Sequence, residues 1–182
     1  DEIVIATREE GIVEISELCH TYGITKCTKV VRGGENRAHS VMLAAMETSA
    51  ELLAVHDGAR PFADWQLIDR CVRAANTYSA AAPAIPVKDT IKVVEGRVVK
   101  NTPDRATLFA VQTPQVFDLD LLRGALKKAE QDGAQVTDDC SAVEAMGYPV
   151  HLVEGSYRNI KITTQEDMII SHAYLAEMRG DL

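Results

Sequence analysis

Two spacings of apolar residues recur along the chain and predict that strands and helices alternate. Residues 52–55 (LLAV) form an apolar run that is too short for a helix and predicts a strand buried on both faces. Longer segments place apolar side chains three or four positions apart, as in an amphipathic helix. The expected strands are 2–7, 29–32, 52–55, 108–113, 150–153 and 159–162; the expected helices are 10–22, a pattern through 41–46, 64–76, 118–132, 137–147 and 163–178.

Residues at the ends of these segments predict where several helices begin. Asp64 and Asp118 are suitable N-caps, and Thr137 is expected to cap a helix with Asp138 and Asp139 in its first turn. Thr163, with Glu166 three residues later, predicts a capping box for the last helix. The small apolar segment 79–87 holds two prolines, which fit strand ends better than a strand centre. The whole pattern predicts an α/β fold of the doubly wound type with a mostly parallel sheet.

Residues 89–102 interrupt this alternation. They predict a strand, a tight turn at Glu95-Gly96 and a second strand, each with rough apolar and polar alternation. A two-stranded hairpin alone is marginally stable in water. We therefore expect an arm at about residues 88–106 that packs against another subunit.

Composition narrows the class of protein. The 182 residues are 46% hydrophobic and 25% charged, which fits one globular domain over residues 1–182. The net charge of −8 argues against a nucleic-acid partner, and no apolar run approaches the roughly 20 residues that span a bilayer. Four cysteines stand singly, without metal-type spacing, and predict reduced thiols in a cytoplasmic protein.

Four polar clusters stand at the ends of predicted strands, at residues 34–40, 57–60, 113–115 and 159–163. Because the carboxyl ends of parallel strands share one edge of a sheet, these clusters can converge there. Asp57 could then hold a divalent cation and Arg60 could bind a phosphate. The alternative is that Asp57 caps a turn and Arg60 forms an ordinary ion pair.

The remaining candidates carry weaker signals. Gly33-Gly34 can expose backbone N–H groups to an anion, or can simply form a turn. Lys161 between apolar neighbours favours a phosphate partner over a surface role, and His56 is interpreted as structural. Neither GxGxxG, GxxxxGK[ST] nor GxSxG occurs, so the sequence gives no support to NAD binding or to a serine nucleophile.

Seven motifs occur in an order and spacing that cover nearly the whole chain. They are HDGARP, PVKDTIK, TPDR, QTPQVF, VTDDCSAVE, VEG and NIKIT. Together they resemble the bacterial 2-C-methyl-D-erythritol 4-phosphate cytidylyltransferase family. The resemblance implies a nucleotidyltransferase version of the doubly wound (Rossmann-like) fold, a homodimer, and a reaction that joins CTP and methylerythritol phosphate in the non-mevalonate route to isoprenoids. It also implies dependence on Mg²⁺.

The resemblance assigns roles to individual residues. It implies that Asp57 and Lys161 are catalytic, with Asp57 near the magnesium ion and Lys161 near the phosphates. The residues implied to lie against CTP are Gly34, Glu35, Arg37 and Ser40. Those implied at the methylerythritol phosphate are Asp57, Arg60, Thr113, Thr137 and Lys161, with Thr90 and Arg105 supplied by the arm of the partner subunit. For Thr90 and Arg105 the alternative is cross-strand pairing on an exposed hairpin.

The chain departs from the family pattern in places. The family begins with a strand and a Gly-rich loop that carries an Arg and, further on, a Lys. Nothing in this sequence corresponds to that opening segment. We interpret the opening segment as trimmed or disordered in a longer protein; the alternative is a natural short form that lacks it. Glu35 replaces a common Asp and Gly58 a common Ala, and both changes are expected to be tolerated. Two rivals are a ribitol 5-phosphate cytidylyltransferase and a truncated, inactive nucleotide-binding dimer.

Overall fold

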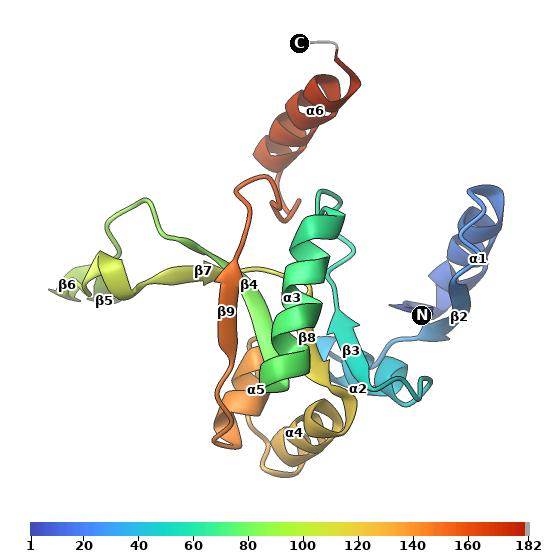
Figure 1. Cartoon of the computed structure of the whole chain (residues 1–182). Helices are drawn as coiled ribbons and strands as arrows, with labels where there is room; N and C mark the ends of the chain where they lie inside the picture. Colours follow the sequence, from blue (N-terminus) through green and yellow to red (C-terminus); the bar gives the residue numbers. More distant parts are fainter. Residues whose placement is uncertain (181–182) are drawn as a thin grey trace.

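The computed structural model describes residues 1–180, so the last two residues of the predicted domain, Asp181 and Leu182, lie outside it. It is an α/β structure with a five-stranded sheet, a separate two-stranded sheet and a projecting hairpin (Figure 1). The strands are β1 (Ile3–Thr7), β2 (Cys27–Arg32), β3 (Leu52–Val55), β4 (Ala80–Pro86), β5 (Val93–Glu95), β6 (Val98–Asn101), β7 (Phe109–Val111), β8 (Gln115–Asp118) and β9 (His151–Glu154). The helices are α1 (Ile12–Thr21), α2 (Arg37–Ala45), α3 (Trp65–Tyr78), α4 (Leu119–Gln131), α5 (Asp139–Ala145) and α6 (Gln165–Arg179), with short 3-10 turns η1 (Glu9–Gly11) and η2 (Arg105–Thr107).

Helices cover both faces of the five-stranded sheet, as expected for a doubly wound fold. Ala80 and Ala82 of β4 pack with Phe117 against α4 and α5. Ala81, on the opposite face of the same strand, packs with Val116 against α3. This alternation follows from the two-residue repeat of a strand, and the small alanine side chains let both helix layers approach closely.

The sheet is mixed, so the prediction of a mostly parallel sheet is wrong in this detail. β4 pairs in parallel with β9, but β3–β8, β4–β8 and β4–β7 are antiparallel. A parallel pair needs a crossover of a dozen or more residues, usually through a helix. Between β4 and β8 the chain instead passes through the hairpin, η2 and β7 and returns directly, which gives antiparallel pairs.

Pro83 lies in the middle of β4 rather than at a strand end. One edge of β4 pairs with β8 at Ala80 and Ala81 and with β7 from Ala84 onward, so Pro83 stands where the partner changes. Its carbonyl accepts a hydrogen bond from the backbone N–H of Gln112, in the link between β7 and β8. A missing N–H is tolerated at this position because no ladder bond requires it.

Two further expectations need correction. Ala54 is exposed and its neighbours in β3 are only half-buried, because β3 lies at an edge of the sheet and pairs with β8 alone among the described strands. Residues 159–162 form a loop, joined to the chain after Asp57 by a bond from Ile162 N–H to the Ala59 carbonyl.

The predicted caps of two helices are each one residue early. Asp138 rather than Thr137 caps α5, and it forms a capping box with Ser141. Thr164 rather than Thr163 caps α6, and its capping-box partner is Asp167. Both true caps stand next to a residue that could also cap, so the sequence alone leaves the position ambiguous by one residue.

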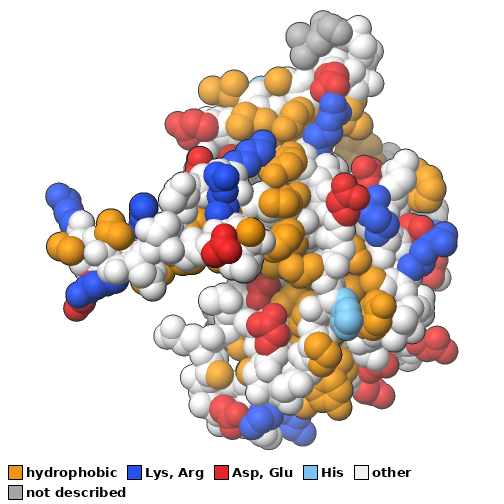
Figure 2. Space-filling view, turned by 60° about the vertical axis from the view of Figure 1, so that its left-hand side comes forward, with side chains coloured by type: hydrophobic (Ala, Val, Ile, Leu, Met, Phe, Trp, Pro, Cys, Tyr) orange, Lys and Arg blue, Asp and Glu red, His pale blue; other side chains and the backbone are white. Residues whose placement is uncertain are grey.

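The hairpin of β5 and β6 projects away from the α/β body (Figure 1) and carries basic and apolar side chains (Figure 2). Every residue of both strands is exposed. Gly96 provides the positive φ of the turn, +59°, close to where the sequence predicts it. Within residues 1–180, every helix is too short or too polar to cross a membrane.

Candidate functional site

Asp57, two residues beyond β3, is surrounded by three cationic side chains. Lys161 Nζ lies 2.9 Å from Asp57 Oδ2, and Arg60 Nε lies 3.7 Å from the same oxygen. Arg37 Nε donates a hydrogen bond to Asp57 Oδ1 at 3.3 Å. One carboxylate thus holds together cations from three separate segments of the chain.

The surroundings shift the pKa values of Asp57 and Arg60. Burial on its own would raise the pKa of Asp57, but Lys161 and Arg37 outweigh it and hold that pKa below its ordinary value. Burial lowers the pKa of Arg60, and Asp57 opposes this. The lowered pKa of Asp57 keeps that carboxylate ionised at neutral pH, and its two arginine partners stay charged because an arginine titrates far above neutral pH.

Local bonds around Thr113 fix the position of Asp57. Thr113 Oγ1 accepts a hydrogen bond from the backbone N–H of Asp57 at 3.0 Å and lies 2.9 Å from His56 Nδ1. His56 Nε2 lies 3.0 Å from the Arg60 carbonyl. The antiparallel register sets Val55 opposite Gln115, so the residues before β8 meet the residues after β3. His56 therefore links two backbone segments, in agreement with its structural interpretation.

Asn159 connects Arg60 to the loop that carries Lys161. Arg60 Nη1 donates to the Asn159 carbonyl at 2.7 Å, and Asn159 Nδ2 donates to the Thr113 carbonyl at 2.8 Å. Asn159 is completely buried, and so are almost all of Thr113 and Gln112, whose Nε2 donates to the Ser156 carbonyl. This buried amide network shapes the loop after β9, so that Lys161 reaches Asp57.

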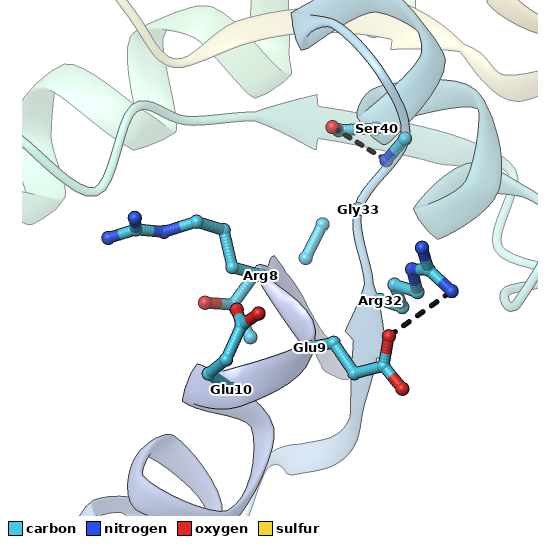
Figure 3. Close-up of a pocket in the computed structure, with 9 residues that line it drawn as sticks. Arg8, Glu9, Glu10, Arg32, Gly33 and Ser40 are labelled. Atoms are coloured by element: carbon cyan, nitrogen blue, oxygen red, sulfur yellow. Dashed lines mark hydrogen bonds and ion pairs between the residues drawn. The ribbon is translucent and has the colours of Figure 1, made fainter.

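An open cleft of about 480 Å³ lies between β1, η1 and the loop that follows β2. Gly33, Gly34 and Ser40 line it together with Arg8, Glu9 and Glu10; Figure 3 shows Gly33 and Ser40 across from Arg8 and Glu10, with Glu9 turned toward Arg32. Ser40 Oγ accepts a hydrogen bond from the Gly34 N–H at 3.0 Å. A Cβ atom at Gly34 would lie 2.3 Å from the His39 ring, so only glycine fits this backbone path.

Arg37 is the first residue of α2 and bridges two carboxylates. Its Nη2 lies 2.8 Å from Asp139 Oδ2, while its Nε holds Asp57. Asp139 is completely buried and follows the Asp138 cap of α5. Gln115 holds this helix end, because its Oε1 accepts from the N–H groups of Asp139 and Cys140 and its Nε2 donates to Asp138.

Comparisons with known proteins agree on one family. The family model described as 2-C-methyl-D-erythritol 4-phosphate cytidylyltransferase (IspD) matches residues 1–177. Enzymes of that name from Halalkalibacterium halodurans and Caldanaerobacter subterraneus are 47% and 43% identical, over 96% of this chain and 77% and 78% of their own length. The chain belongs to the 2-C-methyl-D-erythritol 4-phosphate cytidylyltransferase family.

Solved structures of the cytidylyltransferase family support the same assignment. The 4-diphosphocytidyl-2C-methyl-D-erythritol synthase of Anaerococcus prevotii gives a TM-score of 0.87 at 34% identity, over 96% of this chain and 78% of that one. The Thermus thermophilus cytidylyltransferase gives 0.75 at 39% identity, over 80% and 72%. The resemblance inferred from the seven motifs is confirmed.

The predicted site residues fall into three groups in this cytidylyltransferase structure. Arg37, Arg60 and Lys161 meet around the carboxylate of Asp57, and Thr113 binds the backbone N–H of Asp57. Gly34 and Ser40 line the neighbouring cleft.

The third group lies on other parts of the surface. Glu35 is exposed on its loop. Thr137 is exposed before α5, and its backbone N–H donates a hydrogen bond to Ser141 Oγ. Thr90 and Arg105 are exposed on either side of the hairpin, outside β5 and β6; Arg105 Nη1 donates a hydrogen bond to the Lys88 carbonyl on the opposite side of the arm.

Four buried polar residues that support the site were not singled out from the sequence: Gln112, Gln115, Asp139 and Asn159. Gln115 and Asn159 fall within two of the polar clusters predicted from the sequence but were given no role of their own, and each of the four stands inside one of the seven motifs, which was the available signal. Arg8, at the opening of the cleft, was also missed, although it follows directly after a predicted strand.

Proposed function

We propose that the chain transfers the cytidylyl group of CTP to 2-C-methyl-D-erythritol 4-phosphate. A phosphate oxygen of the sugar attacks the α-phosphorus of CTP, the bond to the bridging oxygen of the β-phosphate breaks, and pyrophosphate leaves with both electrons of that bond. The attacking phosphate is already an anion, so the reaction needs no protein nucleophile. The cluster of Arg37, Arg60 and Lys161 around Asp57 is the observation that carries the proposal, because it suits two mutually repelling phosphates.

The residues divide between the two substrates. Gly34, Glu35, Arg37 and Ser40 are assigned to CTP, whose phosphates would lie near the start of α2. Arg60, Thr113, Thr137 and Lys161 are assigned to the sugar phosphate, with Lys161 in contact with phosphate. Lys161 remains 43% exposed at its side chain, so it can move from Asp57 to a substrate oxygen.

Asp57 is the residue that would hold a Mg²⁺ ion. Mg²⁺ typically binds through one or two carboxylates together with substrate phosphates and water, so a single carboxylate beside a phosphate site fits. Among residues 1–180, no group of three or more His, Cys, Asp or Glu side chains is arranged to hold a metal without a substrate. When bound, the ion would neutralise charge on the phosphates; Asp57 supplies its ligand, and Arg37 and Lys161 orient that carboxylate.

We further propose that residues 1–182 form one cytidylyltransferase domain that works as a homodimer through the arm at about 88–106. Four valines of the arm are exposed: Val93, Val94, Val98 and Val99. They give the arm an apolar surface, which supports packing against a partner subunit. Thr90 and Arg105 would then reach the site of the partner subunit. A cytoplasmic location is retained as part of the proposal, in keeping with four free thiols among the described residues.

One reaction tests the proposal directly. The intact gene product, incubated with CTP, Mg²⁺ and methylerythritol phosphate, is expected to release pyrophosphate and to form the cytidine diphosphate alcohol, detected by mass spectrometry. Ribitol 5-phosphate in place of the methylerythritol phosphate is the matched comparison. Equal or greater turnover with ribitol 5-phosphate would favour the rival substrate, and no turnover with either would favour an inactive nucleotide-binding dimer.

A further inference from the structure

Asp139 is the most deeply buried charged group of the chain's site region. Its side chain is completely inaccessible, and neither carboxylate oxygen makes a hydrogen bond of good geometry within residues 1–180. Its single close cation is Arg37, at 2.8 Å. Burying a carboxylate is costly unless it is paired, so an acid in this position needs a reason.

The charge effects at the two residues are linked. Burial raises the pKa of Asp139, and Arg37 counteracts that rise. Burial alone would lower the pKa of Arg37, but Asp139 and then Asp57 reverse this and raise it. Each partner therefore stabilises the charged form of the other.

The geometry restricts what Asp139 can do. With no exposed surface it cannot meet a substrate that arrives from solvent. Arg37, in contrast, is 36% exposed at its side chain and touches Asp57 with its Nε. Arg37 is therefore the side chain that directly connects Asp139 to Asp57.

We propose that Asp139 is a positioning residue, which fixes the plane of the Arg37 guanidinium so that its Nε faces Asp57 and its remaining N–H donors face the nucleotide phosphates. The proposal rests on the cytidylyl transfer proposed above. Two anchors at different nitrogens restrain a planar guanidinium better than one, because rotation about the Cδ–Nε bond and swinging of the side chain are both blocked.

The backbone supports this role. Asp139 is the first residue of α5, and its N–H together with that of Cys140 is held by Gln115 Oε1 at 3.1 Å. Gln115 is itself buried at the start of β8. The anchor of Arg37 is thus built on a helix end tied to the sheet, rather than on a loop.

The test uses an isosteric change in the intact protein. Asp139→Asn keeps the shape and removes the charge, and we expect the loss of this ion pair to lower kcat/KM for CTP about 10- to 100-fold, equivalent to about 1.4–2.7 kcal/mol. In an Arg37→Gln background the same change is expected to have almost no further effect on kcat/KM, because the arginine that Asp139 positions is already absent. A loss that multiplies in the double variant would overturn the proposal.

A matched control separates positioning from simple helix damage. Val143, also completely buried on α5, packs in the core, so Val143→Ala should lower the melting temperature without changing kcat/KM. If Val143→Ala reproduces the kinetic loss of Asp139→Asn, the carboxylate has no special role. If Asp139→Asn changes only the melting temperature, the proposal is equally wrong.

A second readout needs no catalysis. The Nε–H signal of Arg37, assigned by its disappearance in Arg37→Gln, should exchange slowly with water in the unaltered protein and about tenfold faster in Asp139→Asn. Unchanged exchange in Asp139→Asn would contradict the proposal whether or not the protein turns over CTP. An inactive protein with the expected exchange difference would instead count against the proposed reaction alone.

Discussion

Lys161 Nζ lies 2.9 Å from Asp57 Oδ2, although one residue belongs to the loop after β9 and the other follows β3. Arg60 and Arg37 share the same carboxylate. Without substrate, Asp57 therefore neutralises cations that the proposed reaction requires for phosphates. Each phosphate that enters has to compete with Asp57 for these side chains, which suggests how the site can be changed experimentally.

Removing the charge of Asp57 should separate binding from turnover. In Asp57→Asn the three cations lose their internal anion, so affinity for pyrophosphate is expected to rise about three- to tenfold while cytidylyl transfer falls at least 100-fold. Isothermal titration with pyrophosphate and a steady-state assay measure the two effects. Asp120→Asn, an exposed change on α4, serves as the control. Weaker pyrophosphate binding in Asp57→Asn would show that Asp57 is not a competitor for the cations.

Arg60 and Arg105 are expected to affect one substrate selectively. Replacing either with Ala should raise the KM for the sugar phosphate about 10- to 100-fold and change the KM for CTP much less, because each would lose a charge-assisted contact with that phosphate. Steady-state kinetics with each substrate varied in turn gives both constants. Arg73→Ala, on the exposed side of α3, is the matched arginine control. An unchanged sugar-phosphate KM in both variants would refute these assignments.

Shared sites make a prediction about mixed subunits. If Arg105 acts in the site of the partner, a heterodimer of one Arg105→Ala subunit and one Asp57→Ala subunit contains one intact site. Co-expression with two different tags and tandem purification should therefore recover up to about half of the activity of the unaltered dimer. Verified heterodimers no more active than the two parent variants would argue that each arm serves its own subunit.

The buried amide of Gln115 should matter for stability. Gln115→Ala leaves the N–H groups of Asp139 and Cys140 and a carboxylate oxygen of Asp138 without their partner, which is expected to cost about 1–3 kcal/mol. Urea denaturation measures the free energy of unfolding. The exposed Gln66→Ala on α3 should change it by no more than about 0.5 kcal/mol. A comparable small effect at both positions would show that water replaces the lost bonds of Gln115.

The pH dependence of stability follows from the lowered pKa of Asp57. A carboxylate whose pKa is lower in the folded state than in the unfolded state stabilises the protein above its unfolded pKa, and this contribution is lost as the pH falls through the folded value. The loss is thus expected below about pH 4. Thermal melting between pH 7 and 3 should show a steeper acid decline in the unaltered protein than in Asp57→Asn. If the melting temperatures of both proteins fall in parallel, the cations around Asp57 do not stabilise its ionised form.

The sequence predicted the alternation of strands and helices because that depends on local spacing, but it could not predict how the strands pair. β8 was missed because three residues after Pro114 give too short a pattern, and the resulting antiparallel pairs were missed with it. Asp57, Thr113 and Lys161 nevertheless meet: the pairing of Val55 with Gln115 brings Thr113 beside Asp57, and the hydrogen bond from Asn159 to the Thr113 carbonyl holds the loop that carries Lys161. Asp139 could not be assigned, since its partner Arg37 lies about a hundred positions away and only packing brings them together.

The two glycines beside the site set different limits on change. At Gly34 even one methyl group would collide with the His39 ring, whereas nothing lies within 4 Å of a Cβ at Gly58. In a library that randomises both codons, survivors under selection should therefore keep glycine at the first position and accept several residues at the second. The border of the cleft beside Gly34 thus tolerates little sequence change over evolution, while the turn that carries Asp57 tolerates more.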